Sequence, residues 1–238
     1  SLTIILPAYN EERRISQTIE SYYSYLNMFC NNINNNNNIT HTTTNNNLKC
    51  NIEVTNNLQT ITNADYLVLP GVGSYPDCKK GLQNTKGLID VLSEQVIHKK
   101  KKFLGICVGM QLMFDYSLEK IRTPGFGWLS GNFNKIKAVG KDYLGRNYKV
   151  PHMGWNSLNL KYICHPILEN ISEKDQYYFV HSYYLETSET SQLIASTNYC
   201  HQIPAIVGQE NYLGVQFHPE KSSLSGQKLI SNWLKWKL

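Results

Sequence analysis

The chain has 238 residues, of which 41% are hydrophobic, and it carries a net charge of +5 at neutral pH. This length and composition are enough to fill the core of one sizeable α/β domain. The densest basic run, residues 98–102, has no aromatic or further basic residues interleaved with it. We therefore expect neither a nucleic-acid partner nor a membrane surface.

Six cysteines are scattered along the chain and form no CxxC pair: Cys30, Cys50, Cys78, Cys107, Cys164 and Cys200. This pattern is typical of a reducing compartment rather than of a disulfide framework, so we expect a cytoplasmic protein. The Cys-His pairs at residues 164–165 and 200–201 lack the ligand spacing of a zinc site. We therefore predict no metal and no cofactor.

The opening segment, residues 2–7, is apolar but too short to span a bilayer, and it lacks the features of a signal peptide. Residues 2–6 predict a short strand, and residues 11–28 predict a helix after an intervening loop. Residues 31–47 are almost all Asn and Thr, a composition that cannot bury apolar surface. We predict a disordered surface insertion there.

Strands and helices then alternate. Residues 51–55, 66–69 and 103–107 predict strands, while about 78–98 and a segment starting near Val108 predict helices. Such alternation is typical of a parallel sheet with helices on both faces.

From about residue 127 the sequence changes to shorter strands and turns. The strands predicted in this half are 131–138, 148–150, 176–184, 192–197, 206–209 and 213–216. A closing helix is predicted over 226–238. The whole pattern favours an open doubly wound, mostly parallel α/β sheet of the flavodoxin-like kind, with an antiparallel flank, in a single domain over residues 1–238.

The segment FLGICVGMQ, residues 103–111, carries the clearest chemical signal. A buried strand delivers Cys107 to a sharp turn with Gly105 and Gly109 on either side, and a helix follows. The first N–H groups and the dipole of a helix favour a thiolate at this place, and the same N–H groups can bind an oxyanion. The pattern predicts a nucleophile elbow with Cys107 as the nucleophile.

Two further motifs follow predicted strands. In GVQFHPEK, residues 214–221, a strand ends near His218, and Glu220 lies two residues on, so that a base and an orienting carboxylate reach one sheet edge. In PGVG, residues 70–73, two glycines surround Val72 and permit the close backbone approach that an oxyanion hole needs.

These three motifs, in this order, resemble those of the class I glutamine amidotransferases, whose triad is Cys, His and Glu. The segments KVPHMGWN, residues 149–156, and YFVHSYY, residues 178–184, look like those of the glutaminase of imidazole glycerol phosphate synthase. That enzyme of histidine biosynthesis takes ammonia from glutamine and feeds it to a (β/α)8-barrel partner.

The resemblance implies a role for each matching residue. Cys107 would be the nucleophile, His218 the general acid and base, and Glu220 its orienting carboxylate. Backbone N–H groups would bind the oxyanion at Gly71, Val72, Gly73 and Val108. Residues holding the substrate glutamine would be Gln111, Glu119, His181, Ser182 and Tyr183. Trp155 and Lys221 would face the barrel partner.

The opening LTIILPAYNEE, residues 2–12, departs from this family and is similar to the start of a family 2 glycosyltransferase of the dolichyl-phosphate glucosyltransferase kind. Such enzymes also need an acidic metal motif, usually DxD, and the sequence contains none. Three alternatives therefore stay open beside an active glutaminase: the N-terminal part of a sugar-nucleotide transferase, a catalytically impaired glutaminase-like module, and a fusion of two sources near Thr55.

Overall fold

The computed structural model describes residues 2–5, 20, 24–26, 52–160 and 165–237. Within these ranges the centre of the molecule is a seven-stranded sheet, in the spatial order β11-β12-β13-β4-β3-β1-β2. Its strands are β1 (Leu2–Ile5), β2 (Ile52–Thr55), β3 (Tyr66–Gly71), β4 (Lys102–Cys107), β11 (Leu193–Asn198), β12 (Gln202–Gln209) and β13 (Tyr212–Val215).

Five neighbouring strands of this sheet, from β13 to β2, are parallel. The side chains of β3 and β4 are buried from their second residue to their last, as expected for strands covered on both faces. β12 and β11 add an antiparallel flank next to β13. The predicted fold class, a mostly parallel sheet with an antiparallel flank, is confirmed.

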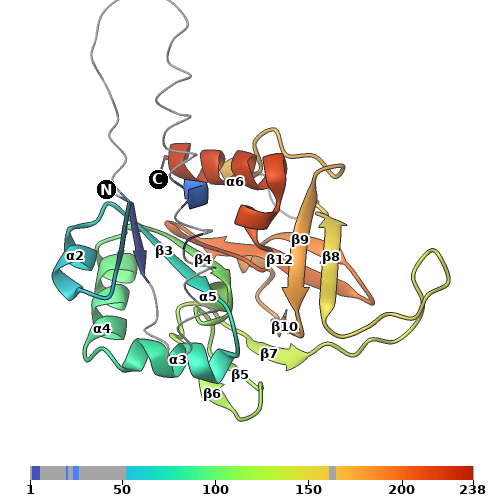
Figure 1. Cartoon of the computed structure of the whole chain (residues 1–238), viewed down its shortest axis with the longest axis horizontal. Helices are drawn as coiled ribbons and strands as arrows, with labels where there is room; N and C mark the ends of the chain where they lie inside the picture. The colour runs from blue at the N-terminus through green and yellow to red at the C-terminus, as the bar shows by residue number, and fades with distance from the viewer. Residues whose placement is uncertain (1, 6–19, 21–23, 27–51, 161–164, 238) are drawn as a thin grey trace, which may run out of the picture.

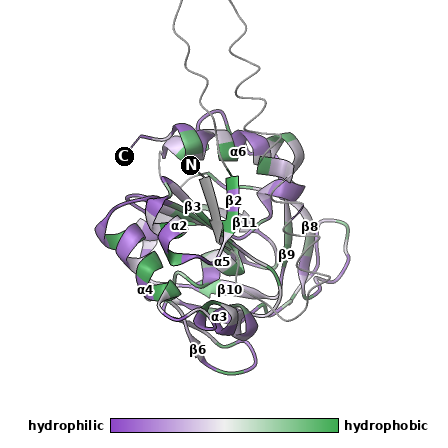
Figure 2. Cartoon of the chain, turned by 60° about the vertical axis from the view of Figure 1, so that its left-hand side comes forward, coloured by the Kyte–Doolittle hydropathy of each residue, from purple (hydrophilic) through white to green (hydrophobic). Residues whose placement is uncertain are grey.

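Helices cover both faces of the sheet. Figures 1 and 2 place α6 on one side and α3 and α4 on the other. The helices are α2 (Leu58–Asn63), α3 (Tyr75–Gln83), α4 (Leu88–Ser93) with a π-helical turn over Glu94–His98, α5 (Val108–Gln111) and α6 (Ser223–Lys235). Single 3-10 turns occur at Pro166–Leu168, Thr190–Gln192 and Pro219–Lys221.

One buried stripe along α6 explains how this helix binds the sheet. Gly226, Leu229, Ile230 and Trp233 follow helical spacing and are buried. The Trp233 ring packs edge-on against Tyr66 of β3, with 5.6 Å between ring centroids. The closing helix is thereby held over the parallel half of the sheet.

Two smaller sheets complete the second half of the chain. One has the order β10-β7-β5-β6, with β5 (Tyr116–Ser117), β6 (Thr123–Pro124), β7 (Asn132–Lys135) and β10 (Tyr183–Glu186). The other is an antiparallel pair of β8 (His152–Ser157) and β9 (Gln176–His181).

Some predicted boundaries were wrong. The helix expected over 78–98 begins at Tyr75 and breaks before Leu88, because Gly87 adopts a left-handed φ of 81°. Residues 148–150 form no strand, whereas the unpredicted strand β8 follows directly after them. The strand expected over 176–184 is two strands that belong to different sheets, and Ser182 separates them.

The predicted Asn/Thr-rich insertion, the loop of the glycosyltransferase-like motif and most of the helix expected over 11–28 lie outside the described residues. β1 is described, and it pairs in parallel with β2 on one side and β3 on the other. No helix in the described ranges is long and apolar enough to cross a membrane.

Candidate active site

Cys107 lies where β4 ends and α5 begins. Its backbone has φ 52° and ψ −111°, outside the regions that a residue with a side chain normally adopts. A non-glycine residue held in such a conformation costs about 1–3 kcal/mol and persists only where the surrounding structure imposes it. The side chain is almost buried, with 5% of the residue exposed. The sharp strand-to-helix turn predicted at Cys107 is therefore present, and the role of Cys107 as a nucleophile stays a prediction.

The flanking glycines let the backbone close around the elbow. A Cβ atom on Gly105 would lie 2.7 Å from the carbonyl oxygen of Gly109. A Cβ on Gly109 would lie 1.8 Å from the carbonyl oxygen of Leu69. Any larger residue at either position would push α5 away from the strands beneath it.

The sheet register fixes the neighbours of Cys107. On one side, Gly71 at the end of β3 is directly in register with Cys107. On the other, Val215 is in register with Ile106, so the residues after β13 lie beside Cys107. The predicted motifs thus converge on one sheet edge, where the carboxyl ends of parallel strands meet.

His218 and Glu220 form a buried pair at this edge. The Nδ1 atom of His218 lies 2.8 Å from Oε1 of Glu220, and the two side chains are 2% and 0% exposed. The backbone of His218 is held as well, because its N–H donates to the Tyr178 carbonyl and its own carbonyl accepts from Ser222 Oγ. The backbone bonds therefore fix the position of His218, and the Glu220 carboxylate orients its imidazole ring.

Burial alone would lower the pKa of His218. The charge and hydrogen bond of Cys107, together with those of Glu220, outweigh burial and raise this pKa from 6.5 to about 10. An imidazolium between a thiolate and a carboxylate is the state in which a cysteine nucleophile is active.

The predicted oxyanion segment lies against the elbow. A Cβ atom on Gly71 would lie 2.6 Å from the backbone nitrogen of Gly109 and 2.7 Å from Cβ of Val108. Gly73 has a φ of 110°, and Cys78 Sγ lies 3.6 Å from the Val72 carbonyl oxygen, to which it donates. Backbone from PGVG and from the start of α5 is thus adjacent, as an oxyanion hole requires.

Gln111, expected to hold the substrate, lies in the last turn of α5 and is 3% exposed. Its Nε2 donates to Oε1 of Gln216 over 3.1 Å, and Gln216 Nε2 donates to Cys107 Sγ over 3.7 Å. The sequence analysis missed Gln216. One signal could have revealed it, since it is the polar residue that interrupts the apolar run from Leu213 to Phe217.

Glu119 contacts the end of a helix. Its carboxylate accepts a 2.8 Å hydrogen bond from the backbone nitrogen of Tyr75, the first residue of α3. A carboxylate at a helix N-terminus is favoured by the helix dipole. This bond anchors the loop after β5 beside the PGVG segment, which ends at Gly73.

His181 is engaged through both ring nitrogens. Nδ1 lies 2.9 Å from the Tyr183 carbonyl oxygen and so carries a proton, which leaves Nε2 to accept from His152 Nδ1 over 3.0 Å. The His152 ring also stacks on Phe179 and Tyr199. The His181 side chain therefore holds β8 against β9, while Ser182 and Tyr183, its half-buried neighbours, stay candidates for binding glutamine.

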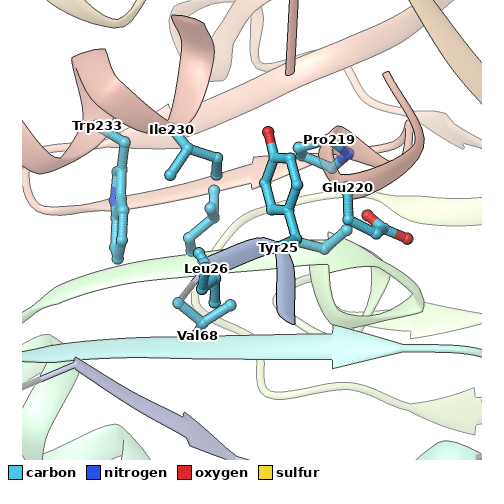
Figure 3. Close-up of a pocket in the computed structure, with 9 residues that line it drawn as sticks. Tyr25, Leu26, Val68, Pro219, Glu220, Ile230 and Trp233 are labelled. Atoms are coloured by element: carbon cyan, nitrogen blue, oxygen red, sulfur yellow. The ribbon is translucent and has the colours of Figure 1, made fainter. Parts of the chain in front are cut away.

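A small cavity of about 10 Å³ lies next to Glu220. Figure 3 shows Tyr25 between Ile230 of α6 and the Pro219–Glu220 segment. Neither the Tyr25 hydroxyl nor Glu220 Oε2 has a hydrogen-bond partner among the described residues. Tyr25, which precedes the Asn/Thr-rich stretch, thus packs close to the carboxylate of the predicted triad.

The residues expected to face a partner lie outside this buried site. Trp155 is 52% exposed on β8, and its ring meets Tyr178 edge-on. It lines a groove of about 900 Å³ between β8 and the hairpin near residues 142–149. Lys221 is exposed and follows Glu220 in the 3-10 turn. Within the described ranges, no group of three or more His, Cys, Asp or Glu side chains could hold a metal ion.

The sequence matches the family model "Glutamine amidotransferase class-I" over residues 19–236. It is 44% identical over 189 residues to "Imidazole glycerol phosphate synthase subunit HisH" of Brucella abortus (strain 2308), covering 78% of this chain and 85% of that one. It is 41% identical over 185 residues to the protein of the same name in Rhodospirillum rubrum, covering 78% and 84%.

Solved structures share the fold at low identity. A crystal structure described as a glutamine amidotransferase has a TM-score of 0.64 and 14% identity, covering 99% of this chain and 98% of that chain. The glutaminase domain of Trypanosoma brucei CTPS, with bound acivicin, has a TM-score of 0.58 and 14% identity, covering 100% and 94%.

Proposed function

The chain belongs to the class I glutamine amidotransferases, and from that premise we propose that it is the glutaminase of an imidazole glycerol phosphate synthase in histidine biosynthesis. The observation that carries the proposal is the convergence of Cys107, His218 and Gly71 at one sheet edge. The sheet that builds this edge takes strands from β1 to β13, which supports one glutaminase domain over residues 1–238.

The first half of the reaction forms a covalent intermediate. The Cys107 thiolate attacks the side-chain amide carbon of glutamine, and backbone N–H groups of Val72 and Val108 bind the oxyanion. His218, charged in the resting enzyme, donates its proton to the departing nitrogen. Ammonia leaves, and a glutamyl thioester remains on Cys107.

The second half consumes one water molecule. His218, now neutral, takes a proton from water, whose oxygen attacks the thioester carbon, and glutamate leaves as the thiolate re-forms. Glu220 accepts from the imidazole Nδ1 throughout and keeps Nε2 directed at the reacting atoms. Burial of the triad keeps bulk water from the charged pair until glutamine has bound.

The released ammonia is used at a second active site. We propose that a (β/α)8-barrel subunit binds over the groove that Trp155 and Met153 line and receives the ammonia without its release as ammonium. Both side chains are more than half exposed in this chain, at 52% and 61%. Aromatic and methionine side chains of this kind are enriched in the cores of protein interfaces.

A covalent-labelling experiment tests the glutaminase proposal. A glutamine-analogue electrophile should modify Cys107, detected by mass spectrometry of its peptide, and Cys107→Ala should neither react nor release glutamate with the barrel subunit present. Cys200→Ala is the matched control, because Cys200 is a half-buried cysteine outside the site. Glutamate release by Cys107→Ala, or an unlabelled Cys107 in the active complex, overturns the proposal.

A further inference from the structure

We propose that Gln216 is a further member of the catalytic apparatus, because it donates a hydrogen bond to the nucleophilic sulfur and fixes the orientation of Gln111. The inference rests on the proposed function, since it takes Cys107 to be the nucleophile. It assigns a role to a residue that lies outside the triad and the oxyanion segment.

The position of Gln216 follows from the fold. β13 ends at Val215, which is in register with Ile106, so the next residue on each strand lies side by side: Gln216 and Cys107. Gln216 is 1% exposed, and its backbone N–H donates to the Ala205 carbonyl over 2.9 Å. A primary amide in such a place is costly to bury unless its groups are paired.

Both polar atoms of the Gln216 side-chain amide form hydrogen bonds: the nitrogen donates one and the oxygen accepts the other. Nε2 lies 3.7 Å from Cys107 Sγ, and Oε1 accepts from Gln111 Nε2 over 3.1 Å. A thiolate can only accept, so it selects the N–H end of Gln216. The amide oxygen of Gln216 must then face Gln111, which can satisfy it only with its own N–H end.

The orientation of Gln111 is therefore linked to the charge of Cys107. Because the Gln111 side-chain nitrogen donates to Gln216, the Gln111 side-chain oxygen is left to face the bound glutamine. This oxygen can only accept hydrogen bonds. An acceptor there suits the α-ammonium group of glutamine and rejects a carboxylate. One buried amide thus serves the nucleophile and the substrate-binding residue together.

Gln216→Glu tests this role, since the carboxylate has the same shape and still accepts from Gln111 but has no N–H for the sulfur. We expect alkylation of Cys107 by iodoacetamide, followed by mass spectrometry from pH 5 to pH 9, to slow about tenfold at neutral pH. The pH profile of this alkylation should move to higher pH. In the complex with the barrel subunit, kcat should fall while KM for glutamine changes little.

Gln216→Met is the second variant, because it is uncharged and loses both hydrogen bonds. It frees Gln111 to rotate, so KM for glutamine should rise as well as kcat fall. Gln209→Glu is the matched control, since it makes the same change at an exposed position at the far end of the β12–β13 hairpin and keeps the acceptor for Tyr212. The pH profile of Cys107 alkylation in this control should equal that of the wild type.

The outcomes separate this inference from the proposed function. If wild-type Cys107 is unreactive toward the glutamine analogue, the proposed function fails. If wild-type Cys107 reacts, and both Gln216 variants, folded by circular dichroism, keep the wild-type pH profile and KM, only the role of Gln216 is overturned.

Discussion

The backbone of Gly109 packs directly on the carbonyl of Leu69, leaving no room for a Cβ atom, which would lie 1.8 Å from that oxygen. Gly109 is in the first turn of α5, just after Cys107, and Leu69 is in β3, just before the PGVG segment. This contact sets the spacing between the sulfur and the N–H groups that would bind the oxyanion.

Gly109→Ala should therefore damage both stability and activity. The methyl group meets backbone rather than a flexible side chain, so α5 must move, and overpacking of this kind costs about 1–3 kcal/mol or more. Urea unfolding should show a lower midpoint with an unchanged slope, and glutamate release should fall at least about tenfold because a displaced elbow misplaces the sulfur.

Gly145→Ala provides the comparison. Gly145 has a φ of 77°, but nothing lies within 4 Å of the Cβ position. Only the left-handed backbone strain of about 1 kcal/mol applies there. Equal losses in the two variants would show that the contact between Gly109 and Leu69 has no special cost.

The charge state of His218 yields a second prediction. Its pKa of about 10 depends on the Cys107 sulfur and on Glu220, which together overcome burial. Cys107→Ser removes the sulfur that helps to raise this pKa, so the pKa of His218 should fall below that of the wild type. Histidine NMR at pH 8 should find a smaller protonated fraction of His218 in Cys107→Ser than in the wild type, and identical titrations would contradict the pairing of His218 with Cys107.

The sequence predicted the parts of the site that strand ends deliver. Cys107, His218 and Gly71 lie at or just after the ends of apolar runs. Parallel strands bring their carboxyl ends to one edge of the sheet, independently of the loops that connect them. Gln216, beside Cys107 on its other side, was missed because its one signal, a polar residue inside an apolar run, does not say whether the side chain is buried.

The boundaries in the second half were harder to predict for a different reason. The run from residue 176 to residue 184 is rich in aromatic residues and reads as one strand, yet the chain changes sheets at Ser182, whose carbonyl accepts from the Ile136 backbone N–H. β8 lies within a Gly- and Pro-containing segment that reads as a turn. Its strand character comes from pairing with β9, whose partner residues lie 19 to 29 positions further along the chain.

The His152–His181 pair predicts acid sensitivity. Burial lowers the pKa of His152 to about 3 and that of His181 to about 4, from 6.5 in an unfolded chain. Below pH 6.5 both histidines become protonated in the unfolded chain but stay neutral in the folded chain. The free energy of unfolding therefore decreases as pH falls from about 6.5 toward 4. The loss between pH 7 and pH 5 should be about 2 kcal/mol for each histidine.

His152→Phe should flatten this dependence. Phenylalanine keeps the stacking on Phe179 and Tyr199 but cannot bind a proton. The variant should be less stable at pH 7, because His181 Nε2 loses its donor, and should lose less stability on acidification. Urea unfolding at both pH values measures this, with the exposed His98→Asn as a control of unchanged slope. An unchanged slope in His152→Phe would contradict the buried neutral pair.

Trp155 tests the partner side of the proposal. Because its side chain is half exposed, Trp155→Ala should change the free energy of unfolding by less than about 1 kcal/mol. A tryptophan that becomes buried against a barrel subunit contributes about 2 kcal/mol or more, so affinity measured by calorimetry should fall more than about tenfold. Leu224→Ala, which removes a side chain 77% exposed on α6, should leave affinity unchanged. Equal affinities for wild type and Trp155→Ala would place the barrel subunit elsewhere, whereas a loss of affinity in Trp155→Ala alone would locate it over the groove that Trp155 lines.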